Sequence, residues 1–407
     1  MNRRLLMISV IAGCAGLLFG CGRKKESLIR YGLVTGPEGT SGSAELTDIS
    51  SGIDTYAAEN AFSTRIYTAS ADTKEGYSVQ FDAAAEDGTA YVISVGESME
   101  VPVYNAQNAN HDQHYLLFDG EPRASGDMES TIRSNTECVT FSRTGIGFLA
   151  GYAAVCSGNR NLVYMSGNNE GDTADYYRGF LGGVDYALAE QGISAGSISI
   201  GVEFAGSDGI SPRRMADAAA RYDGGTELIL TDSPGIAKAV EKAAEEHGGS
   251  VATIGFDDMS SSSSVRFSVV PDWESAVMYL LDQFENHNGF SGGESLMLGA
   301  AEHAIRMNAD YAALGSFSEA SCQSVLELMG NGSASVPASL KEAAEQSGNG
   351  GTELQISFQV NEVEPLPGNA NSGLEEQTAS QTSSDGSSDA GSDGSSDAGS
   401  GESDIGT

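Results

Sequence analysis

Residues 137–186 decide the fold, and they read ECVTFSRTGIGFLAGYAAVCSGNRNLVYMSGNNEGDTADYYRGFLGGVDY. Apolar side chains recur at helical spacing in two segments of this stretch, on either side of a short apolar run at residues 162–165. The first segment carries Leu149, Tyr152, Ala153 and Cys156, and the second carries Tyr177, Phe180, Leu181 and Val184. The pattern predicts strand, helix, strand, helix, which indicates a parallel sheet covered by helices on both faces.

The chain before this stretch alternates in the same way. Strands are predicted at residues 29–35, 64–67, 90–95 and 115–118, and helices at residues 46–57, 74–86 and 98–108. This pattern is typical of a doubly wound α/β lobe, in which ligands bind beyond the carboxyl ends of the strands.

The chain after residue 186 predicts a second lobe of the same kind. Strands are expected at residues 197–204, 227–230 and 251–256, and the strand at residues 265–270 is expected to return to the first lobe. A last crossing is expected before a helix at residues 319–329 and a strand at residues 354–360. We therefore assign residues 28–142 and 265–318 to the N-terminal lobe, and residues 143–264 and 319–363 to the C-terminal lobe.

Composition limits the partners of the protein. The chain has 407 residues, enough for two domains, and a net charge of -36. Such an acidic surface repels nucleic acid, so a nucleic-acid partner is excluded. The region at residues 364–407 ends in a Ser/Gly/Asp repeat that cannot bury apolar area, and we expect it to be a disordered acidic tail.

The N-terminus has the features of an export signal. Arg3 and Arg4 precede an apolar run that is shorter than the roughly 20 residues of a spanning helix. The run ends Leu18-Phe19-Gly20-Cys21, which resembles a bacterial lipobox, although a cysteine can also follow an apolar run by chance. We expect a signal peptide at residues 1–20, lipidation of Cys21 and a tether at residues 21–27. Cys14 lies within the signal peptide, the three other cysteines form no disulfide framework, and Cys156 is expected in the core.

Several motifs in order resemble one family. The strand end VTF, the helix G-F-L-A-G-x-x-A, the helix R-G-F-x-x-G-V, the strand end GFDD at residues 255–258 and the segment ELMGNGSASVP at residues 327–337 are similar to the basic membrane protein family of substrate-binding lipoproteins. The resemblance implies a type I periplasmic-binding-protein fold, with two doubly wound α/β lobes joined by a hinge of several crossings. It also implies a receptor that delivers nucleosides to the permease of an ATP-binding cassette importer.

The resemblance implies two ligand-binding acids. Asp119 stands where the family has an aspartate that accepts hydrogen bonds from a purine, and Asp257 matches the acid before the return crossing. A carboxylate at that point can accept hydrogen bonds from two ribose hydroxyls. Each aspartate could instead cap the turn or helix that follows its strand.

Three further residues are candidates because they end predicted strands. Phe204 would stack on a base, although a core phenylalanine is the more common role of such a residue. Asp232 and Asp258 would add negative charge to the mouth of the site. An acid-lined site favours a neutral polyhydroxylated or cationic ligand over an anion.

The chain departs from the family pattern at two places. Gly42 and Glu45 stand where the first loop of the family carries an aspartate and an aromatic residue. The family lysine after the GFDD strand is missing, because Pro271 takes its place and Arg266 is the only base expected nearby. A changed ligand therefore stays open as an alternative.

Other chemistry is not indicated. The glycines at positions 145, 147 and 151 do not form the dinucleotide fingerprint, and helix packing explains them. His111 and His114 lack the partners of a metal site, and no nucleophile stands near a base. We predict no enzyme activity, no cofactor and no metal. Two functions remain: a lipid-anchored nucleoside receptor of an importer at the outer face of the cell membrane, and a ligand-sensing or interaction lipoprotein on the same fold.

Overall fold

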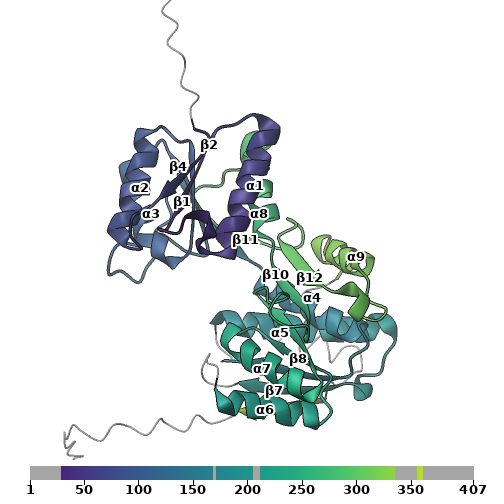
Figure 1. The fold of residues 1–407 in the computed structure, drawn as a ribbon. Helices are drawn as coiled ribbons and strands as arrows, with labels where there is room; N and C mark the ends of the chain where they lie inside the picture. The colour runs from purple at the N-terminus through teal and green to yellow at the C-terminus, as the bar shows by residue number, and fades with distance from the viewer. Residues whose placement is uncertain (1–28, 168–170, 205–210, 335–354, 361–407) are drawn as a thin grey trace, which may run out of the picture. The chain divides into compact units, whose positions relative to one another are not determined.

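The computed structural model describes residues 29–167, 171–204, 211–334 and 355–360 (Figure 1). The chain divides into two units, residues 1–363 and 364–407, and all of the described residues belong to the first. The predicted signal peptide, Cys21, the tether and the acidic tail lie outside the described residues. None of the helices in the described ranges is both long enough and apolar enough to cross a membrane.

The first lobe is a parallel sheet of six strands. Their order is β11-β5-β4-β3-β1-β2, with β1 Tyr31–Thr35, β2 Thr64–Thr68, β3 Tyr91–Val95, β4 His114–Phe118, β5 Thr136–Phe141 and β11 Ser295–Leu298. Helices α1 (Ala44–Asn60) and α8 (Trp273–Asn286) pack together, and α2 (Lys74–Glu86) packs with α3 (Glu100–Ala109). Leu33 belongs to the core cluster of α1 and α8, whereas its neighbour Val34 belongs to that of α2 and α3. The two helix pairs therefore cover opposite faces of the sheet.

The second lobe is a sheet of seven strands. Their order is β12-β10-β9-β8-β6-β7-β13, with β6 Asn161–Ser166, β7 Ser199–Phe204, β8 Leu228–Thr231, β9 Ser250–Ile254, β10 Val265–Pro271, β12 Ile305–Ala309 and β13 Gln355–Val360. Its helices are α4 (Arg143–Cys156), α5 (Gly171–Gln191), α6 (Pro212–Asp223), α7 (Pro234–His247) and α9 (Glu319–Gly330). Only the β10–β12 pair is antiparallel among the described strand pairs.

Two predicted lobe boundaries are wrong, those at residues 264–265 and 318–319. We expected residues 265–270 to return to the N-terminal lobe, but β10 pairs with β9 in the second sheet, and β12 joins the same sheet. The connection from β9 stays in the second lobe and leads to β10, which runs parallel to β9. Along it, the Asp258 N–H donates to Ser268 Oγ at 3.2 Å, and Thr253 Oγ1 donates to the Phe256 carbonyl at 2.9 Å. The chain therefore passes between the sheets after β5, between β10 and α8, and between β11 and β12.

A buried acid makes the first lobe sensitive to pH. Glu137 on β5 is fully buried, and its Oε2 accepts a hydrogen bond from the Ser291 N–H at 2.6 Å. Its Oε1 has no hydrogen-bond partner in the described part of the chain. Burial raises the pKa of Glu137, the Ser291 hydrogen bond lowers it and the charge of Glu294 raises it, and together they bring the pKa to about 7.

The Glu137→Gln variant is expected to remove a pH-dependent part of stability. Because the pKa in the folded protein is about 7 and the ordinary value is 4.5, folding favours the protonated acid, so this contribution falls as pH rises through that window. Relative to wild type, the variant should gain up to about 3 kcal/mol between about pH 5 and about pH 8. Urea unfolding at both pH values measures the change, with Glu59→Gln as an exposed control. An equal pH dependence in wild type and Glu137→Gln would contradict the assignment.

Candidate functional site

Asp119 lies at the carboxyl end of β4, as predicted. It adopts a left-handed backbone conformation, with φ of 46°, and its N–H donates to the Val139 carbonyl at 2.8 Å. This conformation is uncommon for residues other than glycine, and aspartate tolerates it better than most. The turn therefore fixes a half-buried carboxylate at the carboxyl edge of the first sheet.

Asp232 lies at the equivalent edge of the second sheet, directly after β8. Tyr164, a fully buried residue of β6, donates its hydroxyl proton to Asp232 Oδ2 at 2.7 Å. Burial and the negative charge of Asp232 raise the pKa of Tyr164 well above its ordinary value, so the tyrosine stays a donor. The bond orients a half-buried carboxylate at the strand end.

Phe204, at the end of β7, belongs to the same cluster. Its ring meets Tyr177 edge-on with 5.8 Å between the centroids, and Tyr177 in turn lies 5.2 Å from Tyr164. The phenylalanine is half-buried and packs against the core. Phe204 therefore packs as a core phenylalanine. Through Tyr177 and Tyr164, Phe204 and Asp232 contact the same aromatic cluster at one edge of the second sheet.

Asp257 and Asp258 follow β9 and take different partners. Asp257 is exposed, and it accepts hydrogen bonds from the Met259 N–H at 3.1 Å and from Asn308 Nδ2 at 2.8 Å. Asp258 instead pairs with Lys238 of α7, whose Nζ lies 2.7 Å from Oδ1. One oxygen of Asp257 therefore accepts a hydrogen bond within the turn that follows β9, which is the alternative to a ligand-binding role. Asp258 forms an ion pair with α7.

The pKa of Asp258 follows from this pairing. Partial burial by itself would raise the pKa, but hydrogen bonds with Glu241 and Lys238 lower it. The carboxylate therefore stays charged and bound to Lys238, and its charge is largely neutralised within the lobe.

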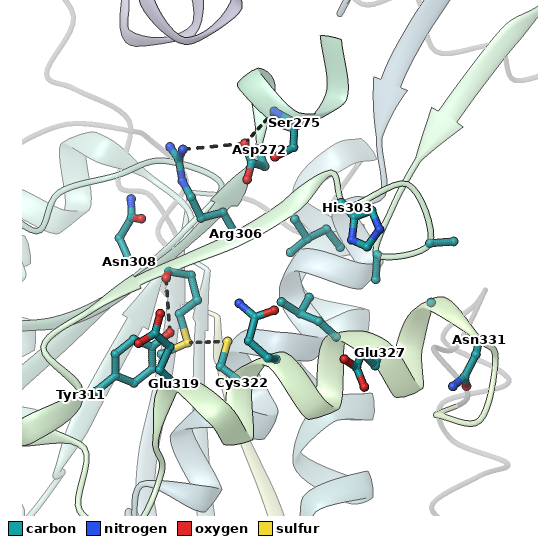
Figure 2. Close-up of a pocket in the computed structure, with 17 residues that line it drawn as sticks. Asp272, Ser275, His303, Arg306, Asn308, Tyr311, Glu319, Cys322, Glu327 and Asn331 are labelled. Atoms are coloured by element: carbon teal, nitrogen blue, oxygen red, sulfur yellow. Dashed lines mark hydrogen bonds and ion pairs between the residues drawn. The ribbon is translucent and has the colours of Figure 1, made fainter. Parts of the chain in front are cut away.

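One basic residue beside the connection from β10 to α8 was not predicted from the sequence. Arg306 of β12 pairs opposite Val270 in the antiparallel ladder, which places its guanidinium 3.7 Å from Asp272 (Figure 2). The guanidinium also lies 3.1 Å from Asp48 of α1. Arg266, the base expected beside Pro271, lies toward the other end of β10 and donates to Ser250 Oγ at 3.0 Å. The expectation was wrong because the antiparallel pairing with β12 was not predicted, and no local signal marks Arg306.

The first-loop departures have simple structural counterparts. Gly42 ends a short 3-10 helix (Gly39–Gly42), and Glu45 lies in the first turn of α1, whose N-cap is Ser43. No group of three or more metal-ligating side chains in the described ranges is arranged to hold a metal ion. The groups that could contact a ligand are carboxylates, an arginine, amides and aromatic rings near the carboxyl ends of strands.

Solved structures share this architecture. A solute-binding protein of an ABC transporter system from Conexibacter woesei DSM 14684 has a TM-score of 0.56 and 15% identity, with 75% of this chain and 96% of that one covered. A transcriptional activator of the comK gene from Bacillus halodurans has a TM-score of 0.54 and 13% identity, with 75% and 98% covered. The two sheets and these likenesses define the class: a type I periplasmic-binding-protein fold with two α/β lobes.

The family follows from the sequence match. Residues 37–337 match the Bmp family, described as ABC transporter substrate-binding protein PnrA-like, and the chain belongs to that family of binding proteins, which is not an enzyme class. The resemblance noted in the sequence is thus confirmed. The ABC transporter nucleoside-binding protein BmpA of Lactococcus lactis subsp. cremoris (strain MG1363) is 20% identical over 242 residues, 58% of this chain and 64% of that protein. The aligned part spans just under two thirds of this relative.

Proposed function

We propose that the protein is a lipid-anchored receptor on the outer face of the cell membrane, which binds a nucleoside between its two lobes and delivers it to an ABC importer. The match to the PnrA-like family carries the proposal, and the similarity to a nucleoside-binding protein supports the ligand class. The lipobox at Cys21 supports the anchor.

The strand-end groups suit the chemistry of a nucleoside. Asp119 would accept hydrogen bonds from the base, and Asp257 would accept them from ribose hydroxyls after exchanging its bond with Asn308. Phe204 would offer a ring to the base. A phosphate group would bring its negative charge close to the carboxylates at these strand ends, so a nucleoside is favoured over a nucleotide.

A sensing or interaction lipoprotein on the same fold is the second candidate. Asp257 already accepts two hydrogen bonds within the chain, and Asp258 is paired with Lys238. Gly42 lacks the carboxylate, and Glu45 lacks the aromatic ring, that the family offers to a base at these positions. These observations favour a changed ligand while the two-lobed scaffold is kept.

A thermal-shift screen tests the ligand class. Purine and pyrimidine nucleosides are compared with sugars, amino acids and polyamines. Ligand at 100 times its dissociation constant should stabilise the protein by about 2.7 kcal/mol. A rise of the melting midpoint with nucleosides alone supports the receptor. A rise with another class only, or with none, rejects nucleoside binding and favours the second candidate.

The Cys21→Ala variant is expected to lose membrane attachment. Without the thiol there is no point for lipid transfer, so the protein should be released or should accumulate as the uncleaved precursor. Membrane fractionation and intact mass measure both outcomes, with Cys156→Ala as the matched cysteine control. Unchanged retention and unchanged mass in Cys21→Ala would contradict the anchor while leaving nucleoside binding untouched.

A further inference from the structure

A groove of about 800 Å³ follows β12 in the second lobe, with α9 as its other wall (Figure 2). Four consecutive residues of β12, from Ile305 to Asn308, line it. Successive residues of a strand point to opposite faces, so a cavity that touches four in a row runs along the edge of the strand. The groove continues to Ala300 at one end and to Tyr311 at the other.

This edge of β12 is open. Within the described residues β12 pairs only with β10 and ends the second sheet, whereas β13 pairs with β7 at the opposite end. The Met307 carbonyl faces outward, where the Tyr311 hydroxyl reaches it at 3.5 Å, a long and weak hydrogen bond. An open strand edge can accept another extended chain through main-chain hydrogen bonds.

The dimensions of the groove match one strand. The five residues of β12 extend about 17 Å at roughly 3.3 Å per residue. Because the volume of about 800 Å³ also extends beyond the two ends of β12, the cross-section along the strand is at most roughly 50 Å². A strand in a packed sheet occupies about 4.8 Å by about 10 Å, which is nearly the same area. The groove therefore has room for one extended segment of about five residues.

The negative charge on the α9 wall of the groove favours an extended segment that carries basic side chains. Glu319 and Glu327 lie on the α9 wall, exposed, and neither forms an ion pair within the described ranges. At 1.5 Å per residue they are about 12 Å apart along the helix. The guanidinium of Arg306 is already shared by Asp48 and Asp272. Residues i and i+4 of a strand lie about 13 Å apart on one face, so basic side chains at that spacing match the two glutamates.

We propose that this β12 groove binds an extended, cationic segment of a partner protein, which adds to β12 as a further strand and places Lys or Arg at positions i and i+4 against Glu327 and Glu319. The parts of this chain outside the described ranges do not match that spacing, since Lys341 is the only base after residue 334, and Arg23, Lys24 and Lys25 are consecutive rather than four residues apart. A second copy is disfavoured because each chain has a net charge of -36. The interaction is independent of the nucleoside proposal.

Labelled peptides test the strand addition by fluorescence anisotropy with the full mature chain. The probe is Thr-Lys-Val-Thr-Val-Lys-Thr, compared with the same peptide carrying Glu for both Lys and with one N-methylated on alternate residues along either edge. The Lys peptide is expected to bind, with at least a tenfold loss for the Glu peptide and for one N-methylated form. Equal binding of both N-methylated forms, or absence of binding, would overturn strand addition.

Paired variants locate the site. The double variant Glu319→Gln, Glu327→Gln should bind the Lys peptide at least tenfold more weakly. The control Glu59→Gln, Glu86→Gln removes the same charge from exposed positions of the first lobe and should bind it like wild type. An equal loss in both variants would show general attraction to an acidic protein and would overturn the groove. Nucleoside thermal shifts should be the same in all of these proteins, which separates this test from the receptor test.

Discussion

Replacing Gly183 with alanine is expected to lower the free energy of unfolding by about 3 kcal/mol or more, the upper range for overpacking. A Cβ at this residue of α5 would lie 1.9 Å from the carbonyl oxygen of Phe148 in α4. The converse holds for Gly147 of α4, where an added Cβ would lie 2.0 Å from the carbonyl oxygen of Tyr176 in α5. Backbone atoms cannot move aside as a flexible side chain can, so the helices must separate.

Urea unfolding of Gly183→Ala and Gly147→Ala measures the loss. The control is Gly196→Ala, where the new methyl would meet only Ser194 Oγ at 3.8 Å, and stability should change by less than about 0.5 kcal/mol. Both helices belong to the second lobe and pack across their glycines, so the loss should be cooperative. A decrease of less than about 1 kcal/mol in the free energy of unfolding of both variants would show that α4 and α5 can separate without strain.

The sequence predicted this crossing only in part. The spacing of the glycines at positions 145, 147 and 151 indicated helix packing rather than a dinucleotide site, and the structure confirms it, since a Cβ added at Gly151 would lie only 2.1 Å from the Phe180 carbonyl oxygen. The partner glycines at positions 179 and 183 were read as a family motif. Their contact with α4 depends on how the two helices cross, which periodicity within one helix does not reveal.

Elements with a helical or strand pattern in their own sequence were predicted well, including one with a weak pattern. The helix expected at residues 74–86 is α2, where an apolar face is preceded by the N-cap Thr73, whose side chain accepts a hydrogen bond from the Gly76 N–H. The strands β11 and β12 were missed, because SLML and IRMNA are short and mostly half-exposed or exposed. Their pairing depends on contacts with β5 and β10, more than 30 residues away in sequence.

The same limit applies to the candidate site. Strand-end acids are visible in the sequence, and Asp119, Asp232 and Asp257 do follow β4, β8 and β9. The hydrogen-bond partners of these acids cannot be read from the sequence. Tyr164, the partner of Asp232, lies on a neighbouring strand, and Asn308, the partner of Asp257, lies near the end of the β10–β12 ladder. The choice between a ligand acceptor and an internal acceptor therefore depends on long-range pairing.

Asp119→Asn is expected to weaken nucleoside binding by about 100-fold. A hydrogen bond to a charged group contributes about 1.5–3 kcal/mol, and the amide presents one acceptor oxygen without the charge. Asparagine also tolerates the left-handed conformation of Asp119, at φ of 46°, so the turn should persist. Isothermal titration with the nucleoside that gives the largest thermal shift measures the loss.

The matched control is Asp127→Asn, an exposed aspartate of the same connection between β4 and β5, which should bind like wild type. Asp119→Gly completes the set, because glycine adopts positive φ without strain and removes the carboxylate altogether. If both Asp119 variants fold and lose affinity while Asp127→Asn keeps it, the carboxylate contacts the ligand. If Asp119→Gly binds like wild type, Asp119 shapes only its own turn, and the acceptor for the base must come from another strand end, even though the protein remains a nucleoside receptor.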